Sequence, residues 1–208
     1  MSECIFLFKR IFDFMLALLI LPVVSPFLFL FAGLIKLDSA GPALFIQKRL
    51  GRNGKVFNCF KFRTMCLGAE ELLRHSIEKD ILLKREWESN FKLKNDPRVS
   101  RIGRFLRKTS LDELPQILNV LRGEMSLVGP RPRPLYEMEG RQNDGAFLAG
   151  LSVLPGLTGL WQVCGRNELG FEHRIRLDAF YVRNWSPWID LWILVKTVYV
   201  VLWQKGAC

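Results

Sequence analysis

A charge-free run of 22 residues, from Phe14 to Ile35, constrains the fold of this chain more than any other feature. About 20 apolar residues are enough for a helix to cross the hydrocarbon core of a membrane. Pro22 and Pro26 lie at the centre of the run, and each removes a helical hydrogen bond and clashes with a carbonyl one turn earlier. The Ser25 hydroxyl can bond a freed carbonyl, as in broken helices within lipid. The run therefore predicts a sharp break at Ser25 and Pro26.

Basic residues flank this run on both sides. Lys9 and Arg10 precede it, and Lys36 follows it, with further lysines and arginines from residue 48 onward. Positive charge marks the cytoplasmic side of a membrane, so both ends are expected on that side. Length alone favours one ordinary transmembrane helix, but the prolines and the charges favour a re-entrant hairpin over residues 1–40. Residues 41–208 then form a domain at the cytoplasmic face.

Composition narrows the class of ligand. The net charge is +10 and half of the 208 residues are hydrophobic, which together favour phosphorylated substrates and a membrane surface. The sequence contains no zinc-finger or helix-turn-helix pattern and no basic run interleaved with aromatic residues, so nucleic acid is not an expected partner. The five cysteines are scattered and form no CxxC pair, which indicates reduced thiols.

Two short strands are predicted around the turn "GRNG" at residues 51–54. Alternation places Lys61 and Arg63 on one face of the second strand, about 7 Å apart. That face is either solvated or directed at phosphate, and the pattern leaves both open. Farther along, "RVSRIGRFLRKTS" predicts a basic amphipathic helix that includes Arg107. Such a helix either lies on anionic lipid headgroups or directs its arginines into a phosphate site.

Two adjacent carboxylates, Asp112 and Glu113, follow in "TSLDELPQILNV". Ser110 and Glu113 fit the capping-box pattern, which would give Glu113 a purely structural role. Alternatively, the pair could bind one Mg²⁺ whose other ligands are water and substrate phosphate. An ionised Asp112 could also accept a phosphoryl group as a nucleophile. Spacing alone does not decide between capping and catalysis.

The stretch "SLVGPRPRPLYE", residues 126–137, holds Arg131 and Arg133 between three prolines. Proline fixes the backbone, and arginine presents a rigid fork of donors that suits phosphate. The stretch is therefore either a turn with solvated charges or a rigid phosphate clamp. The position of Arg131 after the Asp112 helix favours the clamp for that residue, whereas the two readings stand level for Arg133.

The last third of the chain contains three predicted elements. "VLPGLTGLWQVCGRN" predicts a short strand pair, and residues 172–183 predict a helix in which Asp178 could face inward to an arginine. The tryptophan-rich residues 185–203 predict either an interfacial or a core helix, interrupted by charges too often to span a membrane.

Taken together, these motifs resemble the bacterial sugar transferase family, the monotopic phosphoglycosyl transferases. The resemblance runs in order along nearly the whole chain. It is carried by "FKRIFDF" with "SP", "FKFRTM", "DPRVSRIGRFLRKTSLDELPQILNVLRGEMSLVGPRPRP" and "LPGLTGLWQVCGRNELGFEHRIRLDAFYVRNWS". Each fragment alone is weak, but the ordered set is specific. The resemblance covers the catalytic unit, without the additional transmembrane region of larger members.

The resemblance implies transfer of a sugar-1-phosphate from a UDP-sugar to undecaprenyl phosphate, with release of UMP. It implies that Asp112 forms a covalent phosphosugar intermediate, that Glu113 is its dyad partner and that Mg²⁺ assists. It also implies the first membrane step of O-antigen, capsule, exopolysaccharide or glycoprotein synthesis, at the cytoplasmic face of the bacterial inner membrane. We expect six basic residues to bind the substrate phosphates: Lys61, Arg63, Arg107, Arg131, Arg133 and Arg166. An apolar residue is common in relatives at the position of Arg133.

The expected fold is α+β: a membrane-associated catalytic domain with an N-terminal re-entrant helix-break-helix, amphipathic interfacial helices and a small β element. The expected partners are a UDP-sugar, undecaprenyl phosphate and a phospholipid membrane, and a homo-oligomer is compatible with the sequence. Two alternatives to the transferase are a Mg²⁺-dependent lipid diphosphate phosphatase and a non-catalytic membrane scaffold for glycan enzymes. The sequence does not identify the sugar.

Overall fold

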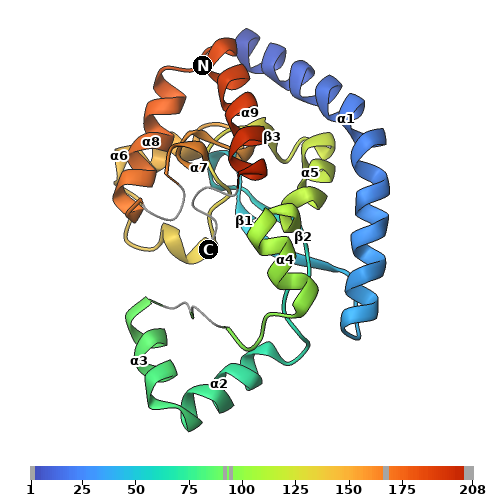
Figure 1. Ribbon diagram of the computed structural model, residues 1–208. Helices are drawn as coiled ribbons and strands as arrows, with labels where there is room; N and C mark the ends of the chain where they lie inside the picture. Colours follow the sequence, from blue (N-terminus) through green and yellow to red (C-terminus); the bar gives the residue numbers. More distant parts are fainter. Residues whose placement is uncertain (1–2, 91–92, 94–95, 166–168, 204–208) are drawn as a thin grey trace.

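The computed structural model describes residues 3–90, 93, 96–165 and 169–203. Helices surround two small sheets, which agrees with the expected α+β class (Figure 1). In chain order the elements are α1 (Glu3–Asp38), β1 (Leu44–Leu50), η1 (Arg52–Gly54), β2 (Val56–Phe62), α2 (Ala69–Lys79), α3 (Ile81–Asn90), α4 (Arg101–Thr109), η2 (Leu111–Gln116), α5 (Ile117–Arg122), β3 (Ser126–Val128), η3 (Leu135–Met138), α6 (Gly145–Leu151), β4 (Gly156–Thr158), α7 (Leu160–Cys164), α8 (Phe171–Arg183) and α9 (Pro187–Leu202).

The long helix α1 is bent and is not interrupted. It contains Pro22 and Pro26 and runs without a gap for 36 residues, and Figure 1 shows it changing direction partway along its length. The Ser25 hydroxyl donates to the Pro22 carbonyl at 3.2 Å, so this side chain bonds the backbone beside the prolines. The expected helix-break-helix is therefore a kinked helix, which is a common consequence of proline inside a helix.

Both ends of α1 contact the same folded body. Near its start, Lys9 donates to the Asp190 carboxylate at the beginning of α9, with 2.5 Å between Nζ and Oδ2. At its end, the Asp38 carboxylate accepts from the backbone N–H of Ile102 in the first turn of α4, at 3.1 Å. The two arms of the kinked helix are thus both anchored to residues 100–190.

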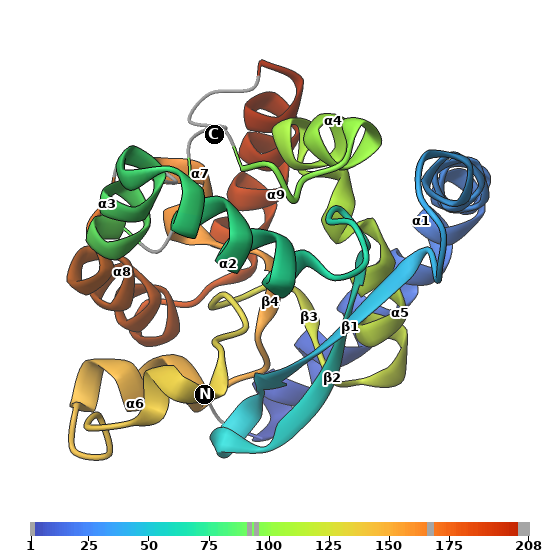
Figure 2. The same ribbon diagram turned by 90° about the horizontal axis from the view of Figure 1, so that it is seen from below.

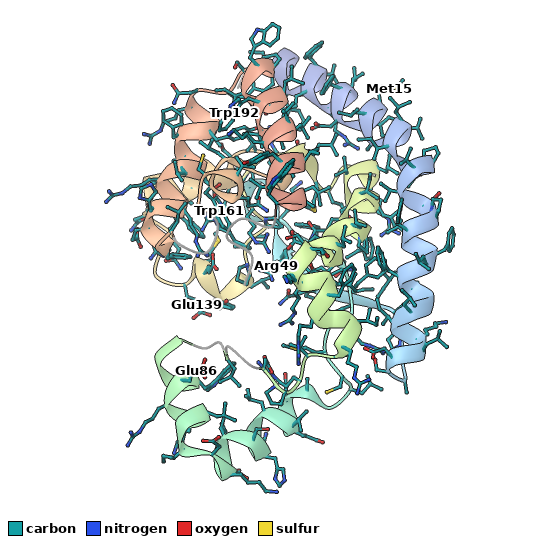
Figure 3. All side chains as sticks on the ribbon, viewed as in Figure 1. Met15, Arg49, Glu86, Glu139, Trp161 and Trp192 are labelled. Atoms are coloured by element: carbon teal, nitrogen blue, oxygen red, sulfur yellow. The ribbon has the colours of Figure 1, made fainter. Side chains whose placement is uncertain are left out.

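The outer surface of α1 is apolar and exposed. Met15 lies on this outer side in Figure 3 and is 58% exposed. Among the described residues, Ile5–Asp38 is the one helix that is long and apolar enough to cross a membrane. The shorter helix α9 exposes Trp188 and Trp192, as expected for a tryptophan-rich helix at an interface.

The strands β1 and β2 form the predicted antiparallel hairpin, with Leu44 opposite Phe62 and Leu50 opposite Val56. The turn "GRNG" joins them, and Asn53 adopts a left-handed backbone there, with φ of 55°. Figure 2 shows this ribbon running from the side of α1 toward the side of α6. The hairpin carries Lys61 to Glu113 of η2.

The predicted strand pair at residues 153–167 is wrong. Residues 156–158 form β4, which pairs in parallel with β3 from the preceding segment, and residues 160–164 form the helix α7. Gly156 permits this pairing, because a Cβ at this position would lie 2.1 Å from the backbone nitrogen of Gly129. The β3–β4 pair therefore holds the two segments close together where the proline-rich loop begins.

The main core lies between α1, α5, β3 and α9. Ala17, Val120, Met125 and Ile193 are all fully buried in it. The helices α2 and α3 extend away from this body in Figure 1. The core therefore fixes the elements that carry the carboxylate pair and the proline-rich loop, whereas α2 and α3 lie apart from it.

Candidate active site

The carboxylate pair lies where α4 ends and η2 begins. Ser110 adopts a left-handed backbone at this junction, with φ of 59°, and Asp112 and Glu113 occupy the first turn of η2. The Ser110 side chain makes no capping hydrogen bond there, so the capping-box explanation for Glu113 is wrong. The pair is consequently available for contacts with distant parts of the chain.

Two cations from different segments bind Glu113. The Arg131 guanidinium donates through Nη2 to Oε1 at 2.6 Å and through Nη1 to Oε2 at 3.2 Å. Lys61, from β2, donates to Oε1 at 2.9 Å. Burial opposes ionisation of Glu113, but the charges of Arg131 and Lys61 outweigh it and lower its pKa to about 2. Glu113 is therefore a fixed carboxylate between two cations.

Asp112 lies beside this cluster and has no hydrogen-bond or ion-pair partner among the described residues. Burial, together with the negative charge of Glu113, raises its pKa to about 6. The group is thus largely ionised at neutral pH, although it is partly removed from water. An ionised carboxylate with unoccupied lone pairs can attack a phosphorus atom.

Arg107 borders the same site from α4. Its Nε donates to the Thr64 hydroxyl at 2.9 Å, and burial lowers the pKa of its guanidinium while the charge of Asp112 opposes that shift. α4 approaches Thr64 closely at Gly103, where a Cβ would lie 2.1 Å from the Thr64 carbonyl oxygen. Lys61, Arg107 and Arg131 are therefore three of the predicted cations that the fold brings to the carboxylate pair.

Backbone hydrogen bonds fix the proline-rich loop on both sides. The Leu50 N–H of β1 donates to the Arg133 carbonyl at 2.8 Å, and the Gly156 N–H of β4 donates to the Pro130 carbonyl at 2.7 Å. Gly129 donates in turn to the Thr158 carbonyl at 2.9 Å. These bonds hold the loop on either side of Arg131, so its side chain extends from a rigid backbone.

Arg133 has different partners from Arg131. It is buried, and its Nη2 donates to Asp178 of α8 at 2.6 Å, while its Nη1 lies 3.4 Å from Glu137. The expectation that Asp178 faces an arginine is therefore confirmed. Burial raises the pKa of Asp178 to about 7, against the opposing charge of Arg133. The Arg133 guanidinium thus ties the loop to α8.

The remaining predicted residues lie elsewhere. Arg63 follows β2 and donates to the carbonyl and the hydroxyl of Ser39 at 2.7 and 2.8 Å, which places its guanidinium at the end of α1. Ser25 and Pro26 lie inside α1. Arg166 lies outside the described residues.

The carboxylate pair also determines what metal the site could hold. No group of three or more His, Cys, Asp or Glu side chains gathers in the part of the chain that the structure describes. Asp112 has free lone pairs, and Glu113 Oε2 accepts only one of the bonds from Arg131 and so retains one. Mg²⁺ commonly uses one or two carboxylates together with phosphate oxygens and water, so this donor set fits Mg²⁺ once substrate is bound.

Three residues that the sequence did not single out lie next to Arg131. They are Arg49 of β1, Trp161 of α7 and Arg174 of α8, and together with Arg131 they line a hollow of about 100 Å³. Figure 3 places Arg49 and Trp161 near the middle of the molecule. No local motif marks these residues, because they converge only through the packing of three separate elements.

Comparison with known proteins gives a consistent result. Residues 4–204 match the family described as "Bacterial sugar transferase". Over 199 residues the chain is 47% identical to the undecaprenyl-phosphate galactose phosphotransferase of Salmonella typhimurium, covering 96% of this chain and 41% of that protein. It is 41% identical over 207 residues to the UDP-glucose:undecaprenyl-phosphate glucose-1-phosphate transferase of Escherichia coli, covering 97% of this chain and 41% of that protein.

A shorter relative aligns over most of its own length. The exopolysaccharide production protein ExoY of Sinorhizobium fredii is 44% identical over 199 residues, which cover 96% of this chain and 87% of that protein. The chain thus spans about two fifths of the length of the Salmonella and Escherichia proteins, and most of ExoY. The match across residues 4–204 includes the carboxylate pair, its cations and the kinked helix, and the chain belongs to the bacterial sugar transferase family.

Proposed function

We propose that the chain transfers a sugar-1-phosphate from a UDP-sugar to undecaprenyl phosphate and releases UMP. The observation that carries this proposal is the contrast within the carboxylate pair. Glu113 is held by Lys61 and Arg131, whereas the adjacent Asp112 is ionisable, partly buried and without a partner among the described residues. A site with one fixed and one free carboxylate beside three cations suits phosphoryl transfer through a covalent intermediate.

In the first step, an Asp112 carboxylate oxygen attacks the β-phosphorus of the donor. A bond forms between this oxygen and phosphorus, and the bond from phosphorus to the oxygen that bridges the two phosphates breaks. The bridging oxygen keeps the electron pair and leaves as part of UMP, so no proton has to move. Asp112 then carries the sugar phosphate as an acyl phosphate.

In the second step, a phosphate oxygen of undecaprenyl phosphate attacks the same phosphorus. The bond to Asp112 breaks, its carboxylate is regenerated, and the lipid-linked sugar diphosphate leaves. Lys61, Arg107 and Arg131 can neutralise the charge on the transferred group, because all three lie at the carboxylate pair. The proposal does not require Arg63 or Arg133 to contact phosphate, since both have partners elsewhere.

Mg²⁺ is the cofactor that we assign to this site. Asp112 and the free position on Glu113 Oε2 would hold it, together with donor phosphate oxygens and water. Bound there, the ion would neutralise phosphate charge and orient the diphosphate. Removal of Mg²⁺ with EDTA should abolish transfer, and added MgCl₂ should restore it, whereas full activity in excess EDTA would exclude this assignment.

The helix α1 supports the proposed membrane location. Both ends of this helix are anchored to one body through Lys9 and Asp38, and its outer surface is apolar. A helix that crossed the bilayer completely would separate these ends by the thickness of the membrane. The kinked helix therefore supports a re-entrant path from the cytoplasmic face of the bacterial inner membrane. A lipid phosphate at that face could then meet a water-soluble donor.

The relatives indicate a class of substrate without fixing the sugar. Their names specify galactose in one case and glucose in another, and a third is named for exopolysaccharide production. We infer that the chain performs the first membrane step of a bacterial surface glycan. A screen of UDP-sugars scored by UMP release identifies the sugar.

The decisive experiment compares wild type with Asp112→Asn. Without undecaprenyl phosphate, wild type should release UMP in a single burst and retain radiolabelled sugar phosphate on the protein. With the acceptor, the label should pass into lipid. Asp112→Asn should lose both reactions by at least about 10³-fold, because its amide cannot act as the nucleophile. Glu78→Gln, which changes an exposed carboxylate on α2, is the matched control.

Other outcomes separate the alternatives. Full turnover in Asp112→Asn would remove the proposed nucleophile. Release of free phosphate from a lipid diphosphate, without any need for a UDP-sugar, would indicate a phosphatase. Biological activity that survives Asp112→Asn but is lost when the tryptophan-rich α9 is removed would indicate a scaffold.

A further inference from the structure

Arginine side chains outnumber carboxylates in the lining of the hollow beside Arg131. Four arginines line it: Arg49, Arg131, Arg133 and Arg174. Arg131 is paired with Glu113, and Arg133 is paired with Asp178 and Glu137. Within the described part of the chain, neither Arg49 nor Arg174 forms an ion pair with a carboxylate.

Neutral acceptors hold the guanidinium groups of Arg49 and Arg174 in place. Arg49 donates to the Gln47 side chain through Nε and Nη2, at 3.2 and 2.5 Å, and to the Pro132 carbonyl through Nη1 at 3.4 Å. Arg174 donates through Nε to the Leu169 carbonyl at 2.9 Å. Burial lowers the pKa of both guanidinium groups, the charge of Arg131 lowers it further, and the charge of Glu137 opposes these shifts. Both stay protonated at neutral pH, and the Glu137 carboxylate, which also lines the hollow, is paired with Arg133, so neither half-buried charge has a carboxylate of its own among the described residues.

Trp161 orders this cluster. The Arg174 guanidinium carbon lies 4.8 Å from the centre of its indole ring, and the Arg131 guanidinium carbon lies 5.9 Å from it. The indole is buried, at 7% exposure, and it fixes the planes of both cations. No hydrogen bond uses the terminal nitrogens of Arg174 within the described residues, which leaves them available to a ligand.

We propose that Arg49 and Arg174 bind the α-phosphate of the nucleotide donor and retain it in the leaving nucleoside monophosphate. Trp161 acts as a positioning residue for Arg174. This inference rests on the proposed function, and it extends the site from the reacting phosphorus to the leaving group. The hollow of about 100 Å³ has room for several water molecules or a phosphate group, while the nucleoside would extend beyond it.

Arg131 connects the two halves of this site. Its guanidinium binds Glu113 beside the nucleophile, and the same side chain lines the hollow with Arg49 and Arg174. The two phosphates of a nucleotide donor share one bridging oxygen, so one arginine between the two centres can contact both. A phosphate at Arg49 and Arg174 then places its neighbour toward Asp112.

The position of the hollow favours the nucleotide over the lipid acceptor. Arg174 and Trp161 belong to α8 and α7, which lie on the other side of the molecule from the C-terminal half of α1 in both Figure 1 and Figure 2. The apolar outer surface of α1 is the surface that faces lipid in the proposed arrangement. A water-soluble donor can therefore reach the hollow without crossing the path of the lipid.

Arg49→Gln, Arg174→Gln and the double variant test the inference in the full chain. We expect each single change to weaken UMP binding and to raise KM for the UDP-sugar about tenfold, the effect of losing one charge-assisted hydrogen bond. Uridine, which lacks the phosphate, should bind wild type and variants alike. Lys48→Gln and Arg176→Gln are matched controls, because these exposed residues lie on β1 and α8 beside the two arginines.

The acceptor provides the second arm of the experiment. KM for undecaprenyl phosphate should stay within about twofold of wild type, which also verifies that the variants fold. A rise in this constant, with UMP affinity unchanged, would assign the hollow to the lipid phosphate and overturn the inference. Unchanged UMP affinity in the double variant would overturn it as well.

UMP binding at the hollow and sugar phosphate transfer can be tested independently of each other. UMP binding is measured without turnover, so it decides the role of the hollow even if wild type transfers no sugar phosphate, which would refute only the proposed function. Trp161→Ala should weaken UMP binding, and Trp161→Phe should recover much of it, because the smaller ring still stacks on Arg174. Equal loss in both variants with normal acceptor KM would remove the positioning role.

Discussion

Arg131 and Glu113 form a bidentate ion pair, in which each terminal guanidinium nitrogen donates to a different carboxylate oxygen. The two residues are 18 positions apart, and the rigid backbone around Arg131 brings them together. The pair has two consequences for the site. It keeps Glu113 ionised beside Asp112, and it fixes the direction in which Arg131 extends.

Arg131→Lys tests the bidentate geometry. Lysine keeps the charge but cannot donate two parallel hydrogen bonds to one carboxylate, so Glu113 and the phosphate contact both lose their orientation. We expect kcat/KM for sugar phosphate transfer to fall about 10–100-fold, as for the loss of one or two charge-assisted hydrogen bonds. The control is Arg183→Lys, which makes the same change at an exposed position on α8. Wild-type kcat/KM in Arg131→Lys would show that charge alone suffices.

The pH profile tests the ionisation of Asp112. Its pKa is raised to about 6, so the nucleophilic carboxylate is present above that pH and is lost as pH falls through it. At low MgCl₂, we expect kcat/KM to decline about tenfold per pH unit below 6. Mg²⁺ and the proton compete for the same carboxylate, so higher MgCl₂ should move this decline to lower pH.

Glu113→Gln tests whether the negative charge of Glu113 raises the pKa of Asp112. Removing the negative charge beside Asp112 should lower the pKa of that carboxyl group. The decline of kcat/KM on the acid side of the pH profile (the acid limb) should then shift to lower pH, even if the substitution also changes the maximal rate. Glu78→Gln should leave the limb in place. A limb that stays near pH 6 in Glu113→Gln would contradict the electrostatic coupling of the two carboxylates.

Short sequence patterns correctly predicted those helices and strands that are determined by residues close together in the sequence. The turn "GRNG" identified the β1–β2 hairpin, and residues 172–183 form the predicted helix, α8, with Asp178 facing an arginine. The capping-box prediction at Ser110 failed because Lys61 and Arg131 bind Glu113 from distant segments, while the Ser110 backbone turns into the left-handed region. Sequence spacing carries no information about such partners.

The basic hollow also depends on contacts between distant segments, which sequence spacing does not reveal. Arg49 on β1 precedes Trp161 on α7 and Arg174 on α8 by more than one hundred residues along the chain. The strand pair expected at residues 153–167 would have placed Trp161 on a strand, whereas β4 instead pairs with β3 and α7 carries the indole. Long-range pairing of β4, and not its local composition, therefore decides where Trp161 lies.

A buried network at the start of α1 should contribute strongly to stability. Asp190 accepts hydrogen bonds from Lys9, the Tyr181 hydroxyl at 2.7 Å and the Trp185 indole at 3.1 Å. Lys9→Met leaves the buried carboxylate without its cation, which typically costs about 3–5 kcal/mol. For a chain of this size, the loss lowers Tm by about 6–20 °C.

Thermal unfolding in detergent measures this effect. Lys196→Met is the control, because it removes an exposed lysine from α9. The double variant Lys9→Met, Asp190→Leu should recover part of the lost Tm, since it removes one of the two buried carboxylates that Lys9 contacts, the other being Asp13 at 3.5 Å. Equal Tm values for wild type and Lys9→Met would show that the ion pair adds nothing to stability.

The path of α1 through the membrane can be tested by cysteine labelling. Phe8→Cys and Ala40→Cys place exposed thiols on either side of the apolar run, in a background that keeps only the buried Cys59. Because Lys9 and Asp38 anchor both ends to one body, an impermeant maleimide should label both positions from the cytoplasmic side only. Labelling of either position from the periplasm would indicate a helix that spans the membrane.

Replacing Pro22 and Pro26 by alanine tests whether the kink causes this path. A straight helix of 36 residues is about 54 Å long, which exceeds the thickness of a bilayer. The straightened helix cannot keep both anchors, so we expect Phe8→Cys to become accessible from the periplasm and transfer activity to fall. If both thiols stay cytoplasmic in the alanine variant, the contacts of Lys9 and Asp38 hold the helix in its re-entrant path without the prolines.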